Sequence, residues 1–136
     1  MNPYEENKLL SEKEIASGAV VLKSVFRGLG VALTSRCPLK CIMCSGWEHK
    51  WDIPESTVSE ISGSFKYLSR LYWQGGEVFL SRYFEPLFDE ASRFINIRQE
   101  IVTSGLMIDL RWAEKLVSAN LNLILSIDGI EKETYE

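Results

Sequence analysis

The sequence predicts an α/β fold in which a parallel sheet forms an incomplete (β/α) barrel. Two observations lead to this prediction. Short apolar runs alternate with longer segments in which apolar residues recur every three or four positions, as along one face of a helix. Each apolar run also ends in a polar or glycine-rich stretch, and the carboxyl ends of parallel strands are where binding residues collect. The chain has room for about three and a half strand–helix units.

Residues 1–29 are expected to form an N-terminal extension outside the sheet. Charged residues with scattered apolar positions predict a short helix over 5–17, and Gly18 suits the position after its end. The apolar segment 19–26 is predicted to be either an additional strand or a packing segment, with a turn at 27–30. This part of the chain carries no recognisable chemistry.

The rest of the chain, residues 30–136, is expected to form the sheet and its helices. Helix-period apolar stripes and capping residues predict helices over about 54–69, over about 84–96, and from the cap residue Asp109 to about Asn120. Residues 131–136 resemble the opening turn of a fourth helix. The four predicted strands are residues 30–34, 71–73, 100–103 and 121–127.

The fourth strand alternates between two kinds of side chain, which predicts its two faces. The wholly apolar face should pack under helices, while the other face points into the barrel. A helix that would cover the apolar face is not complete in this sequence, so we expect either a longer protein or self-association. The expected helix-facing residues are Leu121, Leu123, Leu125 and Ile127, and the expected inner residues are Asn122, Ile124, Ser126 and Asp128.

Composition and charge exclude several functional classes. A chain of 136 residues with 46% hydrophobic residues can form one domain with a core. Its net charge of -4 argues against a general nucleic-acid binder, which needs a basic face. No apolar run approaches the ~18 residues of a membrane span. The first residues also lack the pattern of a signal peptide, so a cytoplasmic protein is expected.

All three cysteines lie in one loop directly after the first strand. Cys37, Cys41 and Cys44 have the spacing C-x3-C-x2-C. In a reducing compartment, an odd number of closely spaced cysteines favours a metal site over a disulfide. A site held by protein alone requires four ligands. Therefore either a fourth protein ligand comes from elsewhere, or one position stays open for a group that is not protein.

A structural zinc site is the main alternative. Cys41, Cys44 and His49 copy the start of a zinc knuckle, and Cys37 could complete a Cys3His set. A further alternative is a module that binds an iron–sulfur cluster without catalysis.

Three more motifs follow the later strands. Gly75-Gly76-Glu77 follows the second strand, and its glycines allow close approach to the backbone while its carboxylate can accept from an ammonium group. Thr103-Ser104-Gly105 follows the third strand, and Ser126-Ile127-Asp128-Gly129 follows the fourth. In this order, with the cysteine motif, they resemble the radical S-adenosylmethionine (radical SAM) family.

The resemblance implies a [4Fe–4S] cluster on Cys37, Cys41 and Cys44, with S-adenosylmethionine on the fourth iron. Gly75, Gly76 and Glu77 would meet its amino group. Ser126 would meet the ribose or the methionyl end, and Met43 takes a position usually held by an aromatic residue beside adenine. Ser104 replaces the usual asparagine, and Val78 replaces the usual proline. The residues expected to bind S-adenosylmethionine are Met43, Gly75, Gly76, Glu77, Ser104, Ser126 and Asp128.

The implied activity is reductive cleavage of S-adenosylmethionine to a 5'-deoxyadenosyl radical, which takes a hydrogen atom from a substrate. An electron donor of flavodoxin or ferredoxin type is implied as partner. The fourth motif, with Glu133-Thr134-Tyr135, resembles the branch that modifies peptides and proteins, and a small-molecule substrate remains an alternative. Without the second half of the barrel, turnover is not expected. Without the cluster, the loop from about Ser35 to Asp52 is expected to be mobile, because no other feature of the sequence ties it down.

Overall fold

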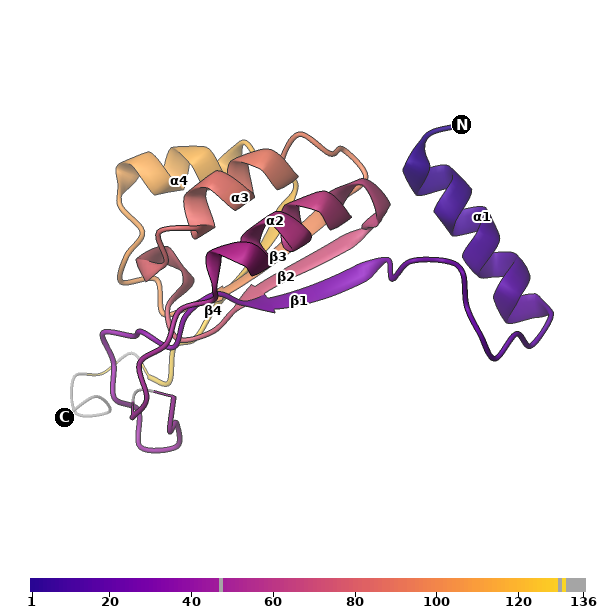
Figure 1. Cartoon of the computed structure of the whole chain (residues 1–136). Helices are drawn as coiled ribbons and strands as arrows, with labels where there is room; N and C mark the ends of the chain where they lie inside the picture. Colours follow the sequence, from indigo (N-terminus) through magenta and orange to yellow (C-terminus); the bar gives the residue numbers. More distant parts are fainter. Residues whose placement is uncertain (47, 130, 132–136) are drawn as a thin grey trace.

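The computed structural model describes residues 1–46, 48–129 and 131, and its centre is one parallel sheet with helices on one face (Figure 1). The strands lie in sequence order, β1-β2-β3-β4. This arrangement confirms the predicted α/β fold as part of a (β/α) barrel. The strands are β1 (Gly28–Ala32), β2 (Arg70–Gln74), β3 (Arg98–Thr103) and β4 (Leu121–Leu125). The helices are α1 (Pro3–Ala16), α2 (Glu55–Ser64), α3 (Phe84–Ala91) and α4 (Leu110–Val117), with short 3-10 helices η1 (Phe65–Tyr67) and η2 (Val78–Leu80).

The N-terminal extension differs from the prediction in two places. β1 already begins at Gly28, where a turn was predicted, because its backbone pairs with β2 from Gly28 opposite Arg70 onward. The apolar segment 19–26 does not form the strand that was one of its two predicted alternatives, and its residues Val20, Val21 and Leu22 are exposed rather than packed. Side chains of α1 bind its backbone instead: Asn7 exchanges hydrogen bonds with Val25, and Glu14 accepts from the N–H groups of residues 23 and 24. Long-range contacts therefore override the local pattern here.

The core lies between the sheet and helices α2 to α4. Trp73 and Ile101 point into it from neighbouring strands and are fully buried. Phe84 of α3 packs on them, with its ring 5.5 Å from that of Trp73 and 5.4 Å from the stacked ring of Trp112. Phe65 adds a further buried ring just after α2. Each such side chain stabilises the fold by roughly 1.5–3 kcal/mol. Most of the predicted helix stripes are buried here, but Ile95, Leu110 and Val117, which were expected on the same faces, are exposed.

Helix α4 begins where the sequence predicted. The carboxylate of Asp109 accepts a hydrogen bond from the backbone N–H of Trp112 at 2.8 Å, which is the geometry of an N-cap. The other two helices end earlier than predicted, α2 at Ser64 and α3 at Ala91. No helix among the described residues is both long and apolar enough to cross a membrane.

The apolar face of β4 is largely uncovered. Leu121 packs against the core, whereas Leu125 is 48% exposed and Ile127 is 59% exposed. The predicted fourth helix turn lies almost entirely outside the described residues. Self-association through this face stays a prediction, which sedimentation of the chain would test.

Candidate metal and cofactor site

The motifs that follow the four strands meet at one edge of the sheet. A cavity of about 390 Å³ opens there. The loop between β1 and α2 leaves the sheet at the same edge (Figure 1). A smaller hollow of about 160 Å³ adjoins it and shares the three cysteines, Gly75 and Gly76. Most of the residues predicted from the motifs therefore lie together. The larger cavity is lined by Cys37, Cys41, Cys44, Gly75, Gly76, Glu77, Ser104 and Ser126, among others.

Two predicted residues do not line the cavity, and several lining residues were not predicted, among them three with polar side chains. Met43 is 75% exposed, and neither Met43 nor Asp128 lines the cavity, so their roles stay predictions. Tyr72, Gln74 and Thr103 line it without having been predicted. Tyr72 and Gln74 alternate with the buried residues of β2, and this alternation was the signal that could have found them.

The two ends of the cysteine loop are joined by hydrogen bonds. The hydroxyl of Ser35 donates to the His49 carbonyl at 2.6 Å and accepts from the Trp51 N–H at 2.8 Å. Arg36 forms an ion pair with Asp52 at 2.6 Å. We call these contacts, which join residues 34–36 to residues 49–52, the loop clasp. The expectation that nothing but a cluster ties down the loop is therefore wrong for its ends, and for the segment that carries the cysteines it stays a prediction.

The glycine motif packs against the same part of the loop. The N–H of Gly76 donates to the Thr34 carbonyl and that of Glu77 donates to the Arg36 carbonyl, both at 2.7 Å. Gly75 has a φ of 133°, a conformation that favours glycine, and a Cβ there would lie 2.4 Å from the Thr34 carbonyl oxygen. The chain's own backbone thus requires these glycines, in addition to the ligand approach that the sequence suggested.

Glu77 is a buried carboxylate held by hydroxyl and amide groups. It is 1% exposed. Its Oε1 accepts from the Thr103 hydroxyl at 2.7 Å, and its Oε2 accepts from the Ser104 hydroxyl at 2.7 Å and the Ser104 N–H at 3.1 Å. Among the described residues no lysine, arginine or histidine forms an ion pair with it. A buried anion without a cationic partner in a cavity is suited to a ligand that brings a positive charge.

The three thiols are free, and all three cysteines line the same cavity. Burial raises the pKa of the Cys37 thiol above its usual value; a backbone hydrogen bond at Leu39 opposes this rise, and the neighbouring Glu77, Cys41 and Cys44 add to it. Within the described part of the chain, no three Cys, His, Asp or Glu side chains are close enough to hold one metal ion. An iron–sulfur cluster does not require the three thiolates to meet at one metal ion, because each thiolate binds a different iron atom. The donor set therefore fits a cluster better than the Cys3His zinc site.

Removing the Thr103 hydroxyl should destabilise the protein. In Thr103→Val, Oε1 of the buried Glu77 loses its hydrogen-bond donor, and we expect a loss of about 1–3 kcal/mol in the free energy of unfolding. Chemical denaturation measures this loss. Thr57→Val on α2 is the matched control, since no hydrogen bond of that hydroxyl is found among the described residues. Equal stability of the two variants would show that Thr103 does not support Glu77.

Comparison with known proteins identifies the family. The sequence model of the Radical SAM superfamily matches residues 31–136. The chain is also 26% identical over 113 residues to a probable GTP 3',8-cyclase of Methanocella arvoryzae (strain DSM 22066 / NBRC 105507 / MRE50). That alignment covers 79% of this chain and 36% of the cyclase, so the chain spans about a third of that relative's length. The family match extends over all four motifs at the sheet edge, and we conclude that the chain belongs to the radical SAM superfamily.

Proposed function

We propose that this chain binds a [4Fe–4S] cluster through Cys37, Cys41 and Cys44, and binds S-adenosylmethionine in the cavity beside them. When bound, the cluster supplies the electron that cleaves S-adenosylmethionine reductively to methionine and a 5'-deoxyadenosyl radical, which takes a hydrogen atom from the substrate. The observation that carries the proposal is the buried carboxylate of Glu77, which faces a cavity shared with three thiols and has no cationic partner among the described residues.

Each motif has a role in this proposal. The bonds from the Gly76 and Glu77 N–H groups to the Thr34 and Arg36 carbonyls hold the start of the cysteine loop, and so Cys37, close to the glycine motif. Thr103 and Ser104 orient the carboxylate of Glu77, which then accepts from the ammonium group of the methionyl end. The backbone of Ser126 bonds to Thr103 at 2.9 Å, which keeps its side chain at the cavity wall for the ribose or the methionyl end.

Three finer features of the function are also proposals. We propose that an electron donor of flavodoxin or ferredoxin type reduces the protein. We propose residues 30–136 as the N-terminal part of a barrel whose remaining part carries substrate determinants, so this chain alone does not turn over substrate. Peptides and small molecules are both candidate substrate classes, and the similarity to a probable GTP 3',8-cyclase supports the small-molecule class.

Anaerobic reconstitution followed by titration with S-adenosylmethionine tests the proposal. We expect iron and sulfide to bind, and the electron paramagnetic resonance spectrum of the reduced cluster to change when S-adenosylmethionine is added. Glu77→Gln should weaken this binding about tenfold or more, because a hydrogen bond to a charged group contributes roughly 1.5–3 kcal/mol.

Glu60→Gln on α2 is the control, since it changes the net charge equally at an exposed position. Unchanged affinity in Glu77→Gln would remove Glu77 from the site. A colourless protein that takes up stoichiometric zinc and resists iron would overturn the cluster itself.

A further inference from the structure

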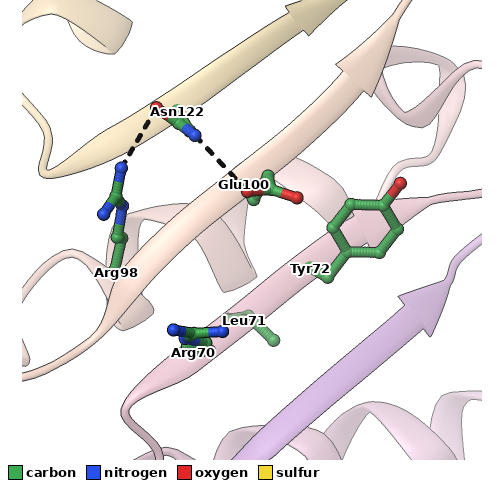
Figure 2. Close-up of a pocket in the computed structure, with 6 residues that line it drawn as sticks. All are labelled: Arg70, Leu71, Tyr72, Arg98, Glu100 and Asn122. Atoms are coloured by element: carbon green, nitrogen blue, oxygen red, sulfur yellow. Dashed lines mark hydrogen bonds between the residues drawn. The ribbon is translucent and has the colours of Figure 1, made fainter.

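The uncovered face of the sheet carries a second pocket, of about 410 Å³. It lies nearer the amino ends of the strands than the cysteine cavity does, on the face opposite the helices. Figure 2 shows its side chains, with Arg70 and Arg98 at one end and the ring of Tyr72 at the other. Glu100 and Asn122 complete its polar lining.

The two arginines lie directly opposite each other. Arg70 of β2 and Arg98 of β3 are register partners on neighbouring strands, which lie about 4.8 Å apart. Like charges in such a pair destabilise a sheet. Neither guanidinium forms an ion pair among the described residues, and the side chain of Arg70 makes no hydrogen bond there either. A cationic pair of this kind is stabilised by an anion placed between the two groups.

The nearby carboxylate does not neutralise this pair. Glu100 lies in the next row of the sheet, opposite Tyr72 and Asn122. The side chain of Asn122 accepts from Arg98 at 3.3 Å and donates to Glu100 at 3.4 Å, so it separates the two charges (Figure 2). The end of the pocket that holds the arginines therefore keeps a positive charge.

We propose that this pocket binds a phosphate group of a small-molecule substrate. The planar guanidinium presents a fork of donors that matches two phosphate oxygens at once. A phosphate also has enough oxygens to accept from both arginines together. The proposal deepens the function proposed above and rests on it, because it assigns the bound molecule as the substrate.

The position of the pocket fits such a molecule. Tyr72 lines both this pocket and the cysteine cavity, so the two spaces adjoin along one face of the sheet. Arg70 and Gln74 are the two ends of β2, and a strand of that length rises about 13 Å between them. An extended phosphorylated molecule can therefore hold its phosphate at the arginines and present its other end at the cofactor cavity.

Calorimetric titration with inorganic pyrophosphate tests the pocket. The probe is added to the chain without cluster, at low and at moderate salt. We expect saturable binding that weakens about tenfold or more in Arg70→Gln and in Arg98→Gln, since each removes a charge-assisted hydrogen bond. Arg93→Gln, at an exposed position just after α3, is the matched control and should bind as the unchanged protein does.

Glu100→Gln gives a test of opposite sign. It removes the negative charge from the pocket while keeping an oxygen that can accept from Asn122, so pyrophosphate should bind more tightly. Glu100→Gln therefore tests phosphate binding even if an arginine variant fails to fold. Circular dichroism of each variant shows whether it is folded.

Absence of saturable binding, equal weakening in Arg93→Gln, or weaker binding in Glu100→Gln would each overturn the pocket. The titration needs no cluster, so its failure is distinct from failure of the proposed function. If the protein binds pyrophosphate but cannot be reconstituted with iron and sulfide, the proposed function is wrong, and so is the assignment of the bound molecule as its substrate. If the protein binds the cluster and S-adenosylmethionine but not pyrophosphate, only the phosphate-binding proposal is wrong.

Discussion

Replacement of any one of Cys37, Cys41 and Cys44 by alanine is expected to abolish cluster binding. The sequence contains no other cysteine that could take over. Iron and sulfide content and the visible spectrum after anaerobic reconstitution measure the effect, which should be a fall to background in each variant.

Loss of the cluster should leave the protein folded. The loop clasp and the core do not include the cysteine side chains, so the cysteine variants should unfold at the same denaturant concentration as the cluster-free protein. Ser45→Ala changes the same loop without touching a thiol, and it should bind a full complement of iron. A cysteine variant that also retained full iron content would show that its thiol is not a ligand.

Gly76→Ala is expected to have the largest effect on stability. A Cβ at this position would lie 2.3 Å from the carbonyl oxygen of Arg36 and 2.5 Å from that of Ser35. Both are backbone atoms, which cannot move aside as a flexible side chain can. The turn after β2 and the cysteine loop would have to separate, breaking the bonds from Gly76 and Glu77 to the loop. We expect a loss of about 3 kcal/mol or more in the free energy of unfolding.

Gly63→Ala provides a control with the opposite sign. Gly63 lies inside α2, and nothing approaches within 4 Å of the place where its Cβ would be. Alanine is favoured over glycine inside a helix by roughly 0.5–1 kcal/mol, so this variant should be more stable. Chemical denaturation compares the two variants directly. If Gly76→Ala were as stable as the unchanged protein, the close packing of the two motifs would be wrong.

Local patterns in the sequence determined the order and type of most elements. Period-2 and helix-period hydrophobicity predicted four strands and the helices between them, because burial on one face imposes those periods. The cap at Asp109 was also predictable, since a capping side chain acts on a backbone group only three residues away. The cysteine spacing and the Gly-Gly-Glu motif indicated the family, which the match over residues 31–136 confirmed.

Contacts between distant segments were decided only by the tertiary structure. β1 begins two residues earlier than its local sequence suggests, because pairing with β2 outweighs the turn preference of glycine. The bonds from Thr103 to Glu77 and the pairing of Arg70 with Arg98 likewise depend on how neighbouring strands align. The physical reason is that a local pattern specifies which face a side chain takes, whereas strand register, set by the packing of the whole sheet, specifies which side chain it meets.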